Sequence, residues 1–340
     1  MKSIVVILSF VSSATALGCV GMWTDNVRNS GSSWASHLAS NESFQEWLLH
    51  SCPLKSFRYW DCYKTRSIER ASLIDKREWV PTDTSCRPFW PYDFLRAMEN
   101  KAILFIGDSV MIQVFITLVC ELYQSTKTNF NIEWSAEPHT GHFVNSDVHF
   151  PVTNTTISFR LKWRYYQHDL QKFLSSISEK VSVIVINFGL WYNLYPRKPA
   201  YQHDPGDYEV ALHALSSDLA SFLQSADTYT KILVLETLPQ HFSGSNPNGF
   251  YNIDAANMGC QPIRNISDDW RLNTMHSVIF PEAVKIVNIT QALYSQWDSH
   301  IDGDVVPQGA RNDADCTHWC LDSGALRFVR LMLWNALISI

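Results

Sequence analysis

Two short motifs far apart in the chain contain the residue types of a serine acyl-transfer site. The first is Gly107-Asp108-Ser109, which we place on a turn between a buried strand and a helix. Such a turn exposes the hydroxyl of Ser109 and puts its backbone N–H at a helix N-terminus, where the helix dipole favours developing negative charge. Ser109 is therefore a candidate nucleophile and oxyanion donor. The alternative interpretation is an ordinary Gly-Asp-Ser turn that caps a helix.

The second motif is Asp315-Cys316-Thr317-His318-Trp319-Cys320, which precedes a predicted final helix. An Asp and a His three residues apart in one turn can face the same way, so the Asp315 carboxylate can hold the His318 ring in the tautomer that accepts the serine proton. Cys316 and Cys320 bracket His318 and would make the turn rigid. The alternatives are a surface Asp beside a packed His, and a Cys/His zinc site. A zinc site would need a third and a fourth ligand at suitable spacing, and paired cysteines are favoured in a secreted chain, so no metal is predicted.

A third candidate group, Asn187, follows another predicted strand in Asn187-Phe188-Gly189. An amide at the end of a strand can donate to an oxyanion alongside the Ser109 N–H. The same tripeptide is equally compatible with an ordinary turn.

Apolar runs that alternate with helical lengths predict the elements that position these motifs. Buried strands are predicted at 102–106, 181–186, 231–235 and 283–287, and helices at 109–122, at 208–223 and after residue 320. Alternating strands and helices indicate an α/β fold with a parallel sheet covered on both faces. Functional groups collect at the carboxyl ends of such strands, where Ser109, Asn187 and Glu236 fall. Between 130 and 166 the pattern is weaker, with possible strands near 132–134 and 157–163.

Three features of the sequence indicate the secretory pathway. Residues 1–17 have the form of a signal peptide with cleavage near Ala16, the alternative being an uncleaved anchor, and no later segment is predicted to span a membrane. Eight cysteines form an even set suited to an oxidising lumen. Sequons for N-glycosylation begin at Asn41, Asn154, Asn265 and Asn288. We therefore expect the mature protein in the lumen of the secretory pathway or outside the cell.

Composition limits the number of domains and the kind of partner. The chain of 340 residues is 46% hydrophobic with a formal net charge of −6, and its longest Lys/Arg run has two residues. These values predict a globular enzyme-sized fold and no nucleic-acid partner. A Trp- and Cys-rich stretch predicts an N-terminal subdomain at 18–96, followed by a catalytic domain at 97–340.

Taken in order, the three motifs resemble the SGNH (GDSL) hydrolase superfamily and, within it, the PC-esterase branch with the plant trichome birefringence-like proteins. The ending at 315–320 is similar to that family's Asp-Cys-Ser-His-Trp-Cys, and Asn187-Phe-Gly-Leu-Trp191 resembles its Asn-Thr-Gly-His-Trp. Pro239-Gln-His-Phe242 resembles its Pro-Thr-His-Phe. The likeness extends from Gly18 to Trp319. It implies a three-layer α/β/α fold with a disulfide-rich N-terminal subdomain wrapped on it.

The resemblance also implies disulfides and further site residues. The implied pairs are Cys19 with Cys86, Cys52 with Cys120, Cys62 with Cys320, and Cys260 with Cys316. Gly141 is a candidate for another oxyanion N–H, and the candidates for substrate contacts are Asp108, Gln113, Gly189, Trp191, His241 and Trp319. The alternatives are a packed or surface role for His241 and a place in the core for the tryptophans. Two positions depart from the family: Ile112 stands where it has Arg, and Leu190 where it has His.

The resemblance points to polysaccharide O-acetylation in the Golgi lumen through an acetyl-Ser109 intermediate, with a glycan as substrate and no bound cofactor. The sequence leaves the acetyl donor, the sugar and the oligomeric state open. One alternative is a carbohydrate acetylesterase with the same residues, in which water accepts the acyl group. The other is an inactive glycan-binding or cell-wall organising protein, favoured by the loss of the family's Arg and His.

Overall fold

The structure is a computed structural model in which most of the region from residue 86 onward is described. The first 61 residues are described only at 19–24. The described residues are 19–24, 62, 74, 77–82, 84, 86–126, 131–136, 143–175, 180–192, 205–225, 230–243, 249, 259–263, 273–301, 314–321 and 323–339.

Within these residues, seven strands form one sheet in the order β4-β5-β6-β3-β7-β8-β9. They are β3 (Ala102–Gly107), β4 (Asn131–Ala136), β5 (Phe143–Phe150), β6 (Thr155–Leu161), β7 (Val181–Asn187), β8 (Lys231–Leu235) and β9 (Val284–Val287). From β6 to β9 all neighbours are parallel, whereas β4 and β5 extend one edge in antiparallel fashion. The predicted α/β class with a central parallel sheet is confirmed, and β5 is a strand that was not predicted.

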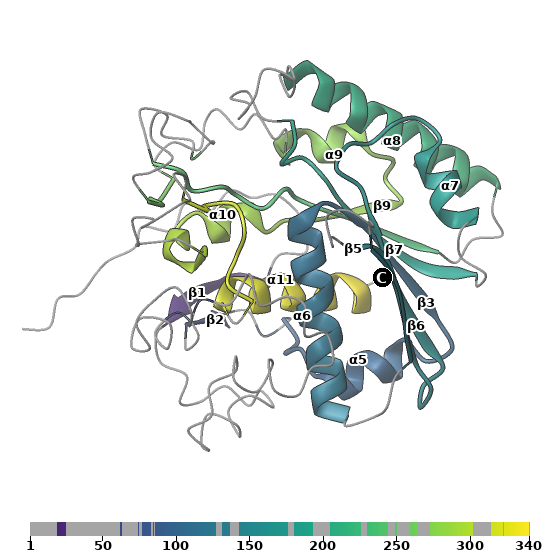
Figure 1. The fold of residues 1–340 in the computed structure, drawn as a ribbon, viewed down its shortest axis with the longest axis horizontal. Helices are drawn as coiled ribbons and strands as arrows, with labels where there is room; N and C mark the ends of the chain where they lie inside the picture. Colours follow the sequence, from purple (N-terminus) through teal and green to yellow (C-terminus); the bar gives the residue numbers. More distant parts are fainter. Residues whose placement is uncertain are drawn as a thin grey trace, which may run out of the picture.

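Helices cover both faces of the sheet (Figure 1). One face carries α5 (Pro91–Ala97), α6 (Ser109–Thr126) and α11 (Gly324–Ile338), and the other carries α7 (Asp169–Ser175) and α8 (Pro205–Ser225), with α9 (His276–Ile279) beside α8. The remaining short elements are α10 (Thr290–Leu293) and the 3-10 helices η3 (Asn273–Met275) and η4 (Trp297–Ser299). This is the three-layer α/β/α arrangement that the resemblance implies.

The central strand β3 places Ser109 at the end of the sheet where the parallel strands have their carboxyl ends. All six of its residues are buried, as expected of a parallel strand covered on both faces. Gly107 ends the strand in a crowded position, because a Cβ there would collide with the Asn187 carbonyl and the Met111 side chain. Only glycine allows β3 to turn directly into α6 at this point.

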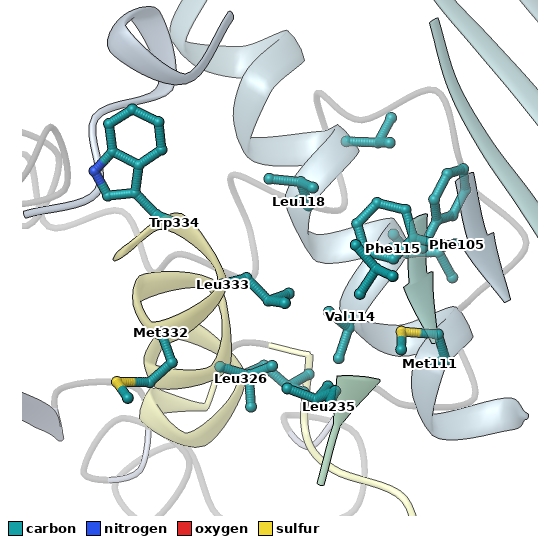
Figure 2. Packing of buried hydrophobic residues seen from close by; sticks show 14 of the residues in the cluster. Phe105, Met111, Val114, Phe115, Leu118, Leu235, Leu326, Met332, Leu333 and Trp334 are labelled. Carbon is teal, nitrogen blue, oxygen red and sulfur yellow. The ribbon is translucent and has the colours of Figure 1, made fainter. Parts of the chain in front are cut away.

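The helix that begins at Ser109 is part of the main hydrophobic core. Figure 2 shows Val114, Phe115 and Leu118 of α6 facing Phe105 and, across the layer, Leu333 of α11. By length and composition α6 could cross a membrane, but 78% of it is buried inside the protein. We therefore assign it as a core helix, which fixes the position of Ser109 through its packing.

The N-terminal strands pack onto this core. β1 (Gly21–Thr24) and β2 (Glu78–Pro81) form an antiparallel pair. Trp23 and Trp79 contact Phe328 of α11. Their ring centroids lie 5.7 and 4.9 Å, respectively, from the centroid of the Phe328 ring. Most of 18–96 lies outside the described residues, so the predicted domain boundaries remain predictions, as does the signal peptide at 1–17.

Three of the four implied disulfides are present: Cys19–Cys86, Cys62–Cys320 and Cys260–Cys316. Cys120 is also disulfide-bonded, and its implied partner Cys52 lies outside the described residues. Disulfide-bonded proteins of this kind are typical of the secretory pathway. Because Cys316 and Cys320 are oxidised, their sulfurs are not available to a zinc ion, and the zinc alternative for this motif is excluded.

Candidate active site

The structure brings Ser109, His318 and Asp315 together at the carboxyl end of β3. Ser109 is the first residue of α6, and the other two lie in the loop 314–321 before α11. His318 Nε2 is 2.8 Å from Ser109 Oγ, and His318 Nδ1 is 2.9 Å from Asp315 Oδ2. The imidazole therefore joins the Ser109 hydroxyl to the Asp315 carboxylate, although Ser109 and His318 are 209 residues apart in the sequence. This arrangement can move a proton from the serine to the histidine.

Asp315 is held as a carboxylate by the turn in which it lies. Its Oδ1 accepts backbone hydrogen bonds from Thr317 (3.2 Å) and His318 (3.0 Å). Burial alone would raise the pKa of Asp315, but the His318 charge and these N–H groups outweigh it and hold the pKa well below its usual range. An ionised Asp315 keeps the hydrogen of the neutral ring on Nδ1, which leaves Nε2 free to accept the Ser109 proton.

The loop carrying His318 is held by an amide clamp from α6. Gln113 is fully buried; its Nε2 donates to the Trp319 carbonyl (2.6 Å) and its Oε1 accepts the Trp319 N–H (3.0 Å). Gln113 lies one helical turn after Ser109, so the clamp joins the helix of the hydroxyl to the loop of the imidazole. The predicted substrate contacts at Gln113 and Trp319 are wrong, because both residues are completely buried and bonded to each other.

Asp108 is also a buried structural residue rather than a substrate contact. Its Oδ1 accepts the N–H of Val110 (3.0 Å) at the start of α6. Burial raises the pKa of Asp108 to about 6, although the N–H groups of Val110, Met111 and Leu190 and the charge on His318 lower it. When ionised, Asp108 therefore adds negative charge near His318 and favours its protonated form.

The Asn187 amide is not in place as an oxyanion donor. Its Nδ2 donates to the carbonyls of Leu235 (3.0 Å) and Glu236 (2.8 Å), which uses both of its hydrogens. This side chain joins the ends of β7 and β8, and the prediction made for it is corrected accordingly. Glu236 Oε2 in turn accepts the N–H groups of Ile289 and Thr290. The backbone N–H of Ser109 remains a candidate donor to the oxyanion. It lies in the first turn of α6, where backbone N–H groups have no acceptor within the helix.

Comparison with known proteins agrees with this geometry. Residues 88–326 match the model of the PC-esterase family, described as a GDSL/SGNH-like acyl-esterase family found in Pmr5 and Cas1p. The chain belongs to the PC-esterase family. The match includes Ser109, Asp315 and His318, so the two motifs that meet in the structure lie within the family's own domain.

Curated relatives of this PC-esterase are plant proteins of low identity. Protein trichome birefringence-like 4 of Arabidopsis thaliana is 21% identical over 85% of this chain and 71% of its own length. Protein trichome birefringence-like 3 of the same plant is 24% identical over 80% and 71%. Xylan O-acetyltransferase 12 of Oryza sativa subsp. japonica is 25% identical over 72% of this chain and 57% of its own length. Relatives of this kind support a family of polysaccharide acetyltransferases and esterases.

Both departures of this PC-esterase from its family's motifs lie in the core. Ile112 and Leu190 are 6% and 7% exposed and belong to the main hydrophobic cluster. Gly189 is likewise a packing residue, because a Cβ there would collide with Thr237 and Tyr208. Gly189 is also buried, so the structure does not support its predicted substrate contact. His241, another predicted substrate contact, is completely buried and does not line the surface either.

Trp191 is the predicted substrate residue that the structure leaves accessible. It is 40% exposed, and its ring stands edge-on to Trp163 with centroids 4.8 Å apart. Leu161 and Asn187 pair with Gly107 on either side of β3. Trp163 and Trp191 come two and four residues after these partners, just as Ser109 comes two residues after Gly107. The aromatic pair therefore lies at the same edge of the sheet as the serine. Trp163 was not singled out from the sequence.

The remaining predicted residues are placed only in part. Asn154 is exposed in the turn between β5 and β6, where a glycan has room, and Asn288 is partly buried next to the buried Ile289 and Thr290. The other sequons, Asn41 and Asn265, and the oxyanion candidate Gly141 lie outside the described residues.

We expect Gln113→Leu to lower kcat by about tenfold to a hundredfold, because small displacements of a catalytic group have effects of this size. The change also leaves the buried N–H and carbonyl of Trp319 without partners, at about 1–3 kcal/mol each in unfolding free energy. Turnover of a small acetyl ester and thermal unfolding measure the two effects. The matched control is Thr117→Val on the same helix, since the Thr117 hydroxyl bonds only backbone carbonyls of α6. An equal loss of kcat in both variants would show that the clamp has no specific role.

Proposed function

We propose that this PC-esterase is a polysaccharide O-acetyltransferase that works through an acetyl-Ser109 intermediate, in the Golgi lumen or outside the cell. The observation that carries the proposal is the 2.8 Å contact between His318 Nε2 and Ser109 Oγ, with Asp315 on the opposite ring nitrogen. Two rice relatives named xylan O-acetyltransferases, 12 and 13, support transfer to a polysaccharide.

In the first half-reaction, His318 takes the Ser109 proton as Oγ attacks the carbonyl carbon of the acetyl donor. The oxyanion of the tetrahedral intermediate forms beside the Ser109 N–H at the start of α6. As the intermediate collapses, His318 returns the proton to the leaving group, and acetyl-Ser109 remains. Ionised Asp315 stabilises the imidazolium that exists between these two proton transfers.

In the second half-reaction, a sugar hydroxyl takes the place of the leaving group. His318 accepts its proton, the sugar oxygen attacks acetyl-Ser109, and the acetylated sugar leaves as the proton returns to Ser109 Oγ. If water occupies this position instead, the product is acetate and the protein is a carbohydrate acetylesterase. The family's description as acyl-esterases favours this second candidate function.

The experiment that separates the two functions uses the disulfide-intact protein with an acetyl donor and a panel of oligosaccharides that includes xylo-oligosaccharides. Mass spectrometry of the products identifies acetylated sugar, which supports transfer, or acetate alone, which supports hydrolysis. Ser109→Ala is the background control for uncatalysed acetylation. Absence of both products above this background for every acceptor would refute the proposed function.

We expect Trp191→Ala to raise KM for an oligosaccharide acceptor about tenfold, equivalent to roughly 1.4 kcal/mol of lost contact, and to leave kcat on a small acetyl ester unchanged. The reason is that an exposed indole at the same end of the sheet as Ser109 offers a sugar ring a large, rigid apolar face. Tyr92→Ala is the matched control, because Tyr92 is 63% exposed but lies on α5, which precedes the amino end of β3. An equal KM in both variants would place the acceptor elsewhere.

A further inference from the structure

Two buried histidines lie directly behind the loop that carries His318. His241 lies in the segment after β8, and His300 follows η4. Both are completely buried, and His241 Nδ1 is 2.6 Å from His300 Nε2. We call these two residues the buried histidine pair.

The outer nitrogens of the pair both face backbone carbonyls. His241 Nε2 is 3.1 Å from the Tyr294 carbonyl, and His300 Nδ1 is 3.1 Å from the His318 carbonyl. A carbonyl oxygen can only accept, so each of these nitrogens must carry a hydrogen. A neutral imidazole has only one hydrogen on its two ring nitrogens. If both rings were neutral, the two inner nitrogens would face each other at 2.6 Å with a lone pair on each and no hydrogen between them.

We propose that the buried histidine pair holds one proton more than two neutral rings, as an imidazolium hydrogen-bonded to an imidazole, and that it positions His318. The third hydrogen lies between His241 Nδ1 and His300 Nε2 and satisfies the short contact. All four ring nitrogens then have a partner of the correct kind. The protonation state is inferred from the hydrogen-bond geometry, while its effect on catalysis rests on the proposed function.

The surroundings of the pair can support a positive charge. The Trp319 ring lies against His300 with centroids 4.0 Å apart, and edge-on to His241 at 5.7 Å. An indole face attracts a cation, most strongly when both are removed from water. The nearby carboxylates have their own partners: Asp298 is held by Arg77 at 2.7 Å, and Asp315 by His318 at 2.9 Å. Among the described residues, the indole and the two carbonyls are therefore contacts that stabilise the charge.

His276 shows what burial does when such contacts are lacking. Neither of its ring nitrogens has a hydrogen-bond partner among the described residues, and burial lowers its pKa to about 4. Desolvation acts on the buried histidine pair in the same direction. There it is opposed by the hydrogen bond between the two rings, by the two hydrogen bonds to backbone carbonyls and by the indole face. His276 is therefore an internal reference for a buried, neutral histidine in the same protein.

The rings of the pair contact the loop 314–321 at the carbonyl oxygen of His318. The His318 carbonyl accepts both the Ile301 N–H (3.1 Å) and the hydrogen on His300 Nδ1. When the third proton is lost, the contact between the two rings loses its hydrogen. One ring must then turn, or one carbonyl must lose its donor. His241 and His300 are in this way positioning residues, whose protonation tightens the backbone that directs His318 toward Ser109.

The protonation state is tested by nitrogen NMR on disulfide-intact protein labelled with [15N]histidine. Long-range proton–nitrogen spectra distinguish a ring nitrogen that carries hydrogen from a bare one, and the variants His241→Gln and His300→Asn assign the signals. At about pH 6, in the range where histidine titrates, we expect three hydrogens on the four nitrogens of the pair and one hydrogen on His276. Two hydrogens on the pair would overturn the proposal, whether or not the protein turns over a substrate.

The positioning role is tested by comparing His300→Leu with His300→Asn. Leu cannot donate to the His318 carbonyl, and we expect Ser109 to react with a fluorophosphonate about tenfold more slowly, with acceptor KM unchanged. Asn can place an amide N–H near the position of Nδ1. It should restore most of the rate but lose the inflection that the pair contributes to the pH profile.

His276→Phe is the control for loss of a buried histidine. Equal rates and wild-type pH profiles for both His300 variants would refute the role. Absence of labelling in the wild-type protein would instead contradict the proposed function.

Discussion

We expect Ser109→Ala to abolish labelling by a fluorophosphonate probe and to reduce acetyl transfer by about four to six orders of magnitude, as in enzymes that depend on one serine nucleophile. His318→Ala should lower the labelling rate by a similar factor, because Ser109 Oγ then loses the base that lies 2.8 Å away. Mass spectrometry of the intact labelled protein measures both effects. It should place a single adduct on the peptide that contains Ser109.

The matched control for this pair of variants is Ser175→Ala. Ser175 is exposed at the end of α7, and its hydroxyl bonds only the Lys172 carbonyl of the same helix. Labelling of Ser175→Ala should equal that of the wild-type protein. Persistent labelling of Ser109→Ala would identify another nucleophile. A wild-type protein that resists the probe would favour the inactive glycan-binding alternative, in which the protein keeps the fold without its chemistry.

Much of the positioning scaffold could be predicted from the sequence because parallel strands have a strong signal. β3, β7 and β8 are almost entirely buried, and each contains an unbroken apolar run. β5 is different. Its residues alternate between buried and partly exposed, but the buried positions include Ser146 beside Val148 and Phe150, so the inward face is not uniformly apolar. This mixed pattern hides the strand, and the antiparallel edge was therefore missed.

The roles of polar residues near the site were harder to predict, because binding a substrate and bonding a buried backbone both require a polar side chain. Gln113 is a buried polar residue within the apolar stretch of α6. That isolation is itself a signal of an internal hydrogen bond, since buried amides are almost always paired. Asp108 caps the same helix, and His241 lies behind the loop. The sequence motifs therefore identify residues that are close to the site, but they do not reveal what these residues do. His300 lies outside every motif, and its contact with the His318 loop depends on the tertiary fold.

The second large effect is expected for Asp315→Asn, which should lower kcat by about 10³- to 10⁴-fold while the protein remains folded. The hydrogen bonds around Asp315 give the reason. Its Oδ1 accepts two backbone N–H groups, so the Asn oxygen will occupy that position. The NH₂ group then takes the place of Oδ2, which is 2.9 Å from His318 Nδ1. It donates to Nδ1, which moves the ring hydrogen to Nε2, and a protonated Nε2 cannot accept the Ser109 proton.

Two measurements separate this tautomer effect from a general loss of charge. The first is the surface control Asp93→Asn on α5, which changes the net charge equally and should leave kcat unchanged. The second is the pH profile of the residual activity. An ionised Asp315 favours the His318 imidazolium, so removing its charge lowers the pKa of His318, and the acid limb of the profile should move to lower pH.

The pH dependence of stability provides a third comparison. The folded pKa of Asp315 is depressed, so its ionised form stabilises the fold at pH values above its ordinary pKa, and this contribution is lost as pH falls. Asp315→Asn should therefore be less stable than the wild-type protein near neutral pH, with the difference shrinking in acid. Denaturant unfolding at several pH values measures it. A variant that keeps near wild-type kcat and an unmoved acid limb would show that His318 acts without the carboxylate.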